Sequence, residues 1–107
     1  MIFLLTAEFA QKYHLKDISN LIPIENHISA GFDTDFAHQN DGYLELSKKY
    51  NITFANKIMD PSIKYKAIGE HKINLIDGYT TDAQIKKHHL VMLQDNMYFS
   101  HHIKVRL

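Results

Sequence analysis

The sequence contains no cysteine and carries no net charge. The lack of cysteine excludes disulfide bonds and thiolate metal sites, although it does not identify the compartment in which the protein works. Lysine plus arginine and aspartate plus glutamate number 12 each, so the formal net charge is zero. A chain without net charge has no field that would attract nucleic acid or an anionic membrane. We therefore expect no nucleic-acid partner.

Long apolar runs are also absent. The run that opens the sequence, MIFLL (residues 1–5), has no basic leader and is broken by Thr6, Glu8 and Gln11. The apolar region of a signal peptide needs about 7–15 residues, and a membrane-spanning helix needs about 20. We expect residues 1–5 to form a buried first strand, and we expect neither a signal peptide nor a transmembrane segment in this chain.

The sequence lacks the common catalytic and metal-binding motifs. There is no GxSxG elbow for a hydrolase, no phosphate-binding loop and no HExxH pair. The adjacent His88 and His89 cannot face the same way on a helix or strand. We therefore expect no enzyme activity, no metal and no cofactor. The histidines considered for a metal site are His14, His27, His38, His71, His88, His89, His101 and His102.

The length of 107 residues, with 45% hydrophobic and 22% charged residues, is typical of one soluble globular domain. Short apolar runs alternate with helical patterns, which predicts an α/β fold. We predict a compact three-layer α/β/α domain over residues 1–107, with a mixed sheet of about five strands and an atypical tail at residues 100–107. The expected strands are residues 1–5, 28–32, 52–59, 73–76 and 90–93. The expected helices are residues 7–13, 16–22, 41–50 and 63–68 and a short one that ends at Lys87.

Individual residues predict where some of these helices begin and end. Thr6 is placed to cap the helix of residues 7–13, and Pro23 is expected to stop the next one. Gly69 is expected to end the helix of residues 63–68. Residues 33–40 are polar and predict a loop, and the helix before Tyr50 is expected to bury Tyr43, Leu44 and Leu46. Residues 96–107 fit no clear element.

The segment IDGYTTD (residues 76–82) is the best candidate for a site. It reads as the end of a strand, a polar tip and the start of a helix, and the carboxyl ends of strands are where α/β sheets present ligand groups. The ring of Tyr79 could hold a cation, Thr80 and Thr81 could donate hydrogen bonds, and Asp82 could cap the helix. An alternative remains open, in which Tyr79 packs at the strand end and the segment simply starts a helix.

Several phrases occur in order along the chain: FAQKYHLKDISNL (residues 9–21), DGY (41–43), MDPSIKYKAI (59–68), IDGYTTD (76–82) and IKK (85–87). Together they resemble the substrate-binding proteins of ABC importers for glycine betaine, carnitine and choline, over about residues 3–99. The resemblance implies a type 2 periplasmic-binding-protein fold, in which two α/β lobes close on a ligand. This chain looks like one of those lobes. The implied partners are a second lobe, an ABC permease and its ATPase. The binding proteins of this family work outside the cytoplasmic membrane and are associated with it.

The resemblance also suggests roles for individual residues. Tyr79 matches one of the aromatic residues that cage a quaternary amine in this family. Gln39 stands where many members have an arginine suited to pair with a substrate carboxylate. Glycine betaine should therefore lose more affinity than choline. Asp33, Asp35 and Phe36 are expected on the loop side that faces the cleft.

The tail departs from the family. At FSHHI (residues 99–103) the family usually reads FFPPY, and a one-base shift of the codons for that phrase gives FSHHI. We interpret this as a frameshift that truncated an ancestral gene. Two functions remain open. The first is a solute-binding lobe for a quaternary amine, weak or inactive alone; the second is a structural remnant that folds and self-associates, as a dimer, without binding ligand.

Overall fold

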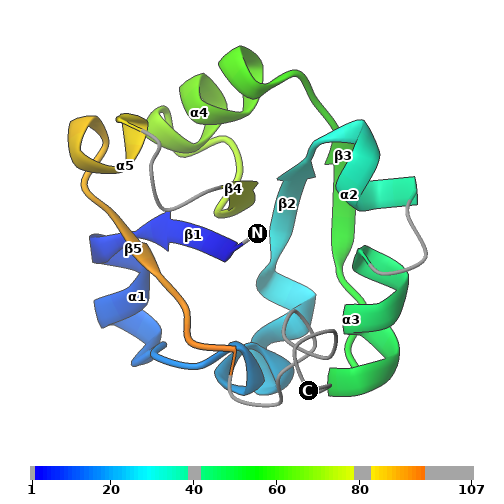
Figure 1. Cartoon of the computed structure of the whole chain (residues 1–107). Helices are drawn as coiled ribbons and strands as arrows, with labels where there is room; N and C mark the ends of the chain where they lie inside the picture. Colours follow the sequence, from blue (N-terminus) through cyan, green and yellow to red (C-terminus); the bar gives the residue numbers. More distant parts are fainter. Residues whose placement is uncertain (1, 39–41, 79–82, 96–107) are drawn as a thin grey trace, which may run out of the picture.

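The computed structural model of the chain describes residues 2–38, 42–78 and 83–95 (Figure 1). Strands and helices alternate along these residues, as the sequence predicts. The elements are β1 (Ile2–Thr6), α1 (Ala7–Tyr13), the 3-10 helix η1 (Ile18–His27), β2 (Ser29–Phe32), α2 (Thr34–His38), α3 (Tyr43–Tyr50), β3 (Ala55–Ile58), α4 (Pro61–Gly69), β4 (Leu75–Gly78), α5 (Gln84–Lys87) and β5 (Leu90–Met92).

The strands form one mixed sheet in the order β3-β2-β4-β1-β5. Strand β2 runs parallel to both β3 and β4, whereas β1 runs antiparallel to β4 and β5. Strand β4 therefore joins the parallel part of the sheet to the antiparallel part. The predicted mixed sheet of about five strands is confirmed.

Apolar side chains cover both faces of the sheet, and this gives the predicted three layers. Successive residues of β1 point to opposite faces. Phe3 and Leu5 belong to a core cluster that includes residues of η1, α2 and α3, while Leu4 belongs to a second cluster that includes Tyr65 and Ile68 of α4. Helices thus lie on both sides of β1.

Aromatic rings fill the first cluster directly beneath the carboxyl end of β2. The ring centroids of Phe32 and Phe36 lie 4.8 Å apart in an edge-to-face pair, and those of Phe3 and Phe32 lie 5.8 Å apart in a stack. Aromatic pairs of this kind add about 0.5–1.5 kcal/mol each beyond burial. These ring contacts hold the end of β2, directly before Asp33, against the core.

The predicted ends of two helices are confirmed. Helix α1 begins after Thr6, whose Oγ1 accepts a 3.2 Å hydrogen bond from the backbone N–H of Phe9. This bond satisfies one of the free N–H groups at the helix start. Helix α4 has Pro61 at its first turn, where the missing N–H costs nothing, and ends at Gly69.

One prediction about helices is wrong, and another needs correction. Residues 34–38 of the expected loop form helix α2, because the buried Phe36 anchors the turn and Ala37 N–H donates to the carbonyl of Asp33.

The 3-10 region continues past Pro23 to His27, so the expected end of the second helix is only partly met. Ile24, directly after Pro23, has a non-helical backbone, and η1 is two short helices that meet at a kink there.

The third strand and one helix face also differ from prediction. Strand β3 begins at Ala55 rather than Ile52, and the buried Ile52 and Phe54 anchor the approach to it without pairing in the sheet. Leu44 is 49% exposed, whereas Leu46 is buried. Two residues along a helix correspond to about 200°, so both could not face the core.

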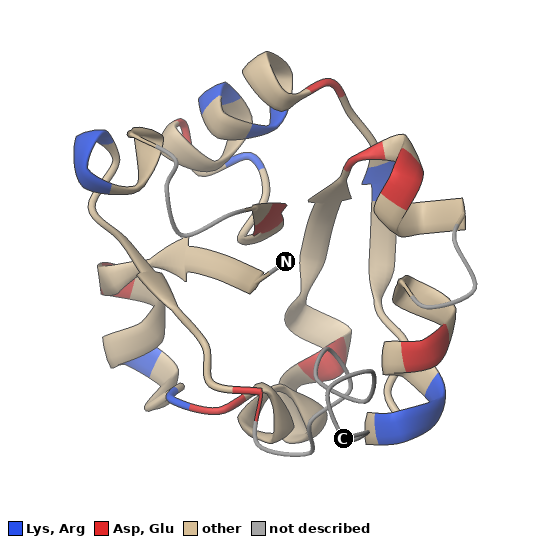
Figure 2. Cartoon of the chain, viewed as in Figure 1, with Lys and Arg blue, Asp and Glu red and all other residues tan. Residues whose placement is uncertain are grey.

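The charges of the described residues are mixed over the surface. Figure 2 shows acidic and basic residues together on α1 and on α3, where Glu45 lies near Lys48 and Lys49. An acidic segment lies at the end of β4, near the middle of the view, and another directly follows β2, in the upper right part. The charges at these two strand ends are the ones that form a buried network.

Candidate functional site

The candidate site lies at the edge of the sheet where β2, β3 and β4 have their carboxyl ends. These three strands are parallel, so their carboxyl ends meet at one edge. The amino end of β1 lies at the same edge, because Ile2 pairs with Gly78 across the antiparallel ladder. Ligands of α/β sheets bind outside the carboxyl ends of the strands. Chain segments from four strands therefore converge at this edge.

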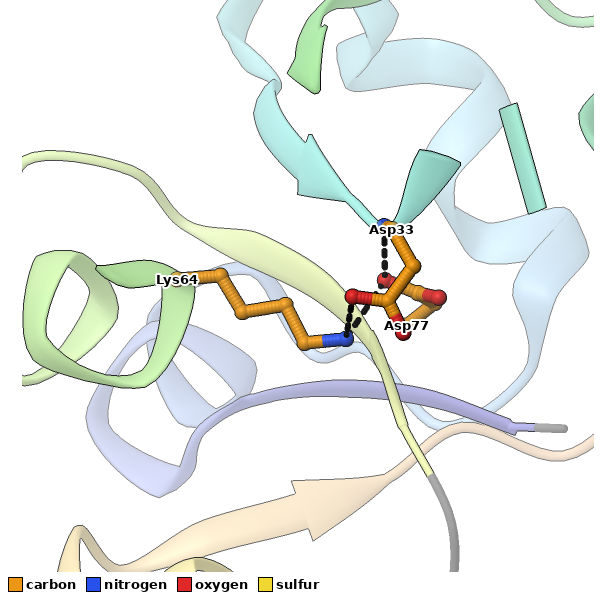
Figure 3. A network of polar contacts seen from close by, with 3 residues as sticks. All are labelled: Asp33, Lys64 and Asp77. Carbon is orange, nitrogen blue, oxygen red and sulfur yellow. Dashed lines mark hydrogen bonds and ion pairs between the residues drawn. The ribbon is translucent and has the colours of Figure 1, made fainter. Parts of the chain in front are cut away.

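A network of three charged residues stands at this edge (Figure 3). The ammonium of Lys64 lies 2.9 Å from Oδ1 of Asp77 and 3.0 Å from Oδ1 of Asp33. The backbone N–H of Asp33 donates a 3.1 Å hydrogen bond to the same Oδ1 of Asp77. The network thus joins the end of β2, the end of β4 and helix α4.

The local sequence places each member of the network. Asp33 directly follows β2, and Asp77 is the third residue of β4. Lys64 lies in the first turn of α4, where its backbone N–H donates to the carbonyl of Asp60. The apolar stem of a lysine packs well against a core, and Lys64 is only 2% exposed.

The two carboxylates differ in their exposure. Asp77 is fully buried, whereas the side chain of Asp33 is 24% exposed. Oδ2 of Asp77 is buried and has no hydrogen-bond partner within the described residues. Two carboxylates face one ammonium, so the ionised network carries one surplus negative charge. Such a charge is costly in a buried site unless another cation balances it.

Burial raises the pKa of the Asp77 carboxyl above its ordinary value. Loss of water around the charged form is the largest cause, and the nearby charge of Asp33 acts in the same direction. The hydrogen bond and charge of Lys64, with the bond from the backbone of Asp33, lower this pKa but do not cancel the effect of burial. The environment of Asp77 therefore resists its negative charge.

The residues proposed from sequence as ligand contacts, Gln39, Tyr79, Thr80, Thr81 and Asp82, lie outside the described residues. The structure describes what flanks them. Strand β4 ends at Gly78 and α5 begins at Gln84, while α2 ends at His38 and α3 begins at Tyr43. The two segments that hold the proposed contacts are thus each bounded by described residues.

Three other residues were expected on the cleft side, and the structure corrects part of that expectation. Phe36 does not line a cleft, because it is 2% exposed in the aromatic core. Asp35 is exposed on α2. Asp33 is at the expected edge, where it pairs with Lys64.

Lys64 is the functional candidate that sequence reasoning missed. In the sequence it stands out only as one residue of a helical pattern. A lysine among Tyr65, Ala67 and Ile68, all of them buried, was the available signal. Its partners lie 13 and 31 positions away in sequence, at Asp77 and Asp33, so no local pattern reveals them.

A hollow of about 630 Å³ lies elsewhere, between α4 and α5. Tyr65 and Gly69 line one side, and Gln84 and His88 line the other. None of the three charged residues of the network lines it. Among the residues that the structure describes, no cluster of three or more histidine and acidic side chains is arranged to hold a metal ion.

The sequence matches a family described as the substrate binding domain of the ABC-type glycine betaine transport system, over residues 3–105. The chain belongs to this family. The match covers nearly the whole chain, and it agrees with the family that the phrases along the sequence resemble.

Two curated relatives give the comparison more detail. The chain is 36% identical over 96 residues to the ergothioneine transport permease/ergothioneine binding protein EgtU of Helicobacter pylori (strain G27), covering 89% of this chain and 17% of that protein. It is 31% identical over 100 residues to the carnitine transport binding protein OpuCC of Listeria monocytogenes serotype 1/2a (strain 10403S), covering 92% and 32%. The chain thus spans a third or less of these relatives. They are transport proteins, as expected for a family without enzyme activity.

Solved structures share the fold. A crystal structure described as a glycine betaine/carnitine/choline ABC transporter superposes with a TM-score of 0.86 at 31% identity, covering 92% of this chain and 36% of that one. Apo YehZ from Escherichia coli superposes with a TM-score of 0.81 at 16% identity, covering 92% and 39%, which supports the fold alone. The predicted type 2 periplasmic-binding-protein fold is confirmed. None of the helices in the described ranges is long and apolar enough to cross a membrane.

Proposed function

We propose that this chain is a solute-binding lobe of an ABC import system and that its ligand is a quaternary amine such as glycine betaine, carnitine or choline. Membership of the glycine betaine family supports this. The names of the two relatives point to the same chemistry, because carnitine and ergothioneine both carry a trimethylammonium group. The shared feature of the ligand class is a permanent cation that cannot donate a conventional hydrogen bond.

The place where β4 ends is the observation that supports the proposal. Strand β4 ends at Gly78, directly before Tyr79, at the edge where parallel strands present ligand groups. An aromatic face attracts a quaternary ammonium through its quadrupole, with about 0.5–2 kcal/mol for each ring. We assign this role to Tyr79.

The remaining proposed contacts complete this edge. Thr80 and Thr81 donate hydrogen bonds to the polar end of the ligand, and Asp82 caps the turn that leads to α5. Gln39 offers a hydrogen bond but no charge, so it holds a carboxylate less firmly than an arginine would. Choline has a hydroxyl in place of the carboxylate, so it loses less affinity than glycine betaine when glutamine replaces arginine here.

We propose that the lobe works with partners and binds weakly alone. One aromatic ring and a few neutral hydrogen bonds, at about 0.5–1.5 kcal/mol each, fall well short of the roughly 8 kcal/mol that micromolar binding needs. A second lobe would supply the other rings, and a permease and an ATPase would complete the importer. The same proposal implies that the lobe acts on the outer side of the cytoplasmic membrane.

The structural remnant stays as a second candidate, and one observation favours it. Ile58 at the end of β3 is 49% exposed, and Ile63 in the first turn of α4 is 53% exposed. Both lie near the carboxyl-end edge of the sheet. Exposed apolar side chains favour association, so this edge is suited to a second copy of the chain as well as to a ligand.

Titration monitored by NMR tests the proposal. Choline, carnitine and glycine betaine are added up to about 0.5 M, and amide shifts near Gly78 are followed. Saturable shifts that Tyr79→Ala removes, while folding stays nearly unchanged, would support the binding lobe. Tyr13→Ala on α1 is the matched control, because it removes a tyrosine far from this edge. No saturable shift with any of the three amines would favour the remnant.

A further inference from the structure

Strand β3 forms one edge of the sheet, and its backbone is open on one side. In the described part of the sheet β3 is the first strand and pairs with β2 alone. All four of its residues, Ala55–Ile58, are exposed. An exposed edge strand is a template on which another strand can pair. The open side of β3 is therefore a candidate interaction surface.

The free hydrogen-bonding groups of this edge belong to Asn56 and Ile58. The backbone N–H of Met59 points inward and donates to the carbonyl of Phe32 on β2. The backbone groups of successive residues in a strand point to opposite sides, so those of Asn56 and Ile58 point outward. No described residue pairs with these outward groups. Two residues thus offer two donors and two acceptors to a further strand.

We propose that this edge is the docking surface for a second copy of the chain, in which the two β3 strands pair antiparallel about a two-fold axis at Ile58. Each strand then meets the same strand of the other copy, as a closed two-fold dimer requires. The two five-stranded sheets join into one continuous sheet. The inference goes beyond the proposed transport function, because it needs no ligand.

The side chains distinguish the possible positions of the axis on β3. With the axis at Lys57, two ammonium groups lie directly opposite each other, which is destabilising. With the axis at Ala55 or Asn56, an outward residue lies opposite Phe54. The backbone N–H and carbonyl of Phe54 are already bonded to a tyrosine hydroxyl of the same chain, so they are not free to pair. Neither objection applies to an axis at Ile58.

An axis at Ile58 also suits the exposed side chains around it. Ile58 is 49% exposed, and the axis sets it against Ile58 of the other copy, so both apolar side chains lose contact with water. Lys57 lies opposite Met59, against which its apolar stem can pack. Asn56 lies opposite Asp60, an exposed carboxylate that makes no cap bond to α4. The side-chain amide of Asn56 can donate a hydrogen bond to this carboxylate.

Single cysteine variants measure where the axis lies, because the chain itself has no cysteine. Directly opposite residues of an antiparallel pair have Cα atoms about 4.5–5.5 Å apart, a distance that a disulfide spans. Ile58→Cys should therefore give a disulfide-linked dimer under mild oxidation, seen on a non-reducing gel. Lys57→Cys and Asn56→Cys are the matched controls. Both should link about tenfold more slowly or less, since their equivalent Cα atoms lie more than about 7 Å apart.

Sedimentation of the full chain at high micromolar concentration tests the association without a crosslink. The unmodified chain should form a dimer in a concentration-dependent way. Ile58→Lys replaces the apolar pair on the axis by two opposed charges, so it should weaken the dimer by about tenfold or more. Leu44→Lys is the control, because Leu44 is equally exposed but lies on α3. It should leave the dimer unchanged.

Three results would overturn the inference. A strict monomer would show that Lys57 protects this edge from every partner, including a second copy. Fastest linkage of Lys57→Cys or Asn56→Cys would move the axis away from Ile58. Equal dimerisation of Ile58→Lys and Leu44→Lys would place the contact on another surface. All of the substituted residues are exposed, so the variants should keep the fold, and circular dichroism checks this.

Discussion

Gly42 lies against the backbone carbonyl of Phe36, with no room for a side chain between them. The contact brings the start of α3 onto α2. Because the neighbour is backbone, it cannot rotate away as a side chain would.

Gly42→Ala should therefore destabilise the fold by about 1–3 kcal/mol, the usual cost of overpacking. Gly69→Ala is the matched control. A Cβ there would lie 2.6 Å from Nδ1 of His88, but that ring belongs to a half-buried side chain that can turn aside. We expect Gly69→Ala to change the free energy of unfolding by less than about 1 kcal/mol, since alanine also favours the helix. Urea denaturation measures the free energy of unfolding of both variants. Equal losses of stability would contradict the close contact at Gly42.

Lys64→Met should be strongly destabilising, by about 3–5 kcal/mol at neutral pH. The substitution leaves two carboxylates facing each other without their shared cation. Lys66→Met, on the exposed side of the same helix, should stay within about 0.5 kcal/mol of the unmodified chain. Chemical denaturation at neutral pH compares the two, and a similar small effect for both would show that the network does not stabilise the fold.

The stability contributed by Asp77 should fall as the pH rises. Its pKa in the folded state is raised above the ordinary value of 3.8, so the native state binds this proton more tightly than the unfolded state does. The contribution is fully present below the unfolded-state pKa and is lost as pH rises through the folded-state pKa.

Asp77→Asn keeps the shape and does not titrate. The variant should therefore gain stability relative to the unmodified chain as the pH rises from about 3 to about 8. The measurement is the difference in the free energy of unfolding at each pH, which cancels the groups that both proteins share. A difference that stays constant over this range would mean that burial does not raise the pKa of Asp77.

Gln39→Arg should improve the binding of glycine betaine and leave choline almost unchanged. A charge-assisted hydrogen bond contributes about 1.5–3 kcal/mol, which corresponds to about tenfold to a hundredfold in affinity. Glycine betaine has a carboxylate to receive it, and choline does not. Gln11→Arg, on exposed α1, is the control. Equal gains for both ligands would argue that Gln39 does not face the carboxylate.

The chain should self-associate through the edge that bears Ile58 and Ile63, with a two-fold dimer as the expected form. Sedimentation at high micromolar concentration measures the mass. Ile63→Ser should weaken the association, whereas Leu44→Ser, a similarly exposed residue on α3, should not. A strict monomer at this concentration, or equal effects of both variants, would exclude this edge as the contact.

Local patterns predicted much of the fold. The helix of residues 7–13 and its cap at Thr6 follow from nearby side chains, and both were predicted from sequence. Helix α2 was missed, because the burial of Phe36 that stabilises it comes from distant rings such as Phe3. A polar stretch around one aromatic residue looks like a loop until its tertiary partners are known.

The candidate site also has one part that local sequence predicted and one part that only the fold reveals. Its position after the fourth strand was visible in the sequence, because a strand end followed by a polar tip is a local feature. The network beneath it was not, since Asp33, Lys64 and Asp77 come together only when β2, α4 and β4 pack. A charged residue in an apolar pattern indicates that a partner exists, but only the fold identifies it.

The central position of β4 has a consequence for how the chain is made. The strand that joins β2 to β1 is residues 75–78, and β1 pairs with β4 and β5 in the described part of the sheet. During synthesis β1 therefore emerges before its partners in the sheet, which lie more than 65 residues further along the chain. Until Leu75 leaves the ribosome, a nascent chain can pair β2 with β3 but cannot close the sheet. Its apolar first strand is then a natural contact for a chaperone.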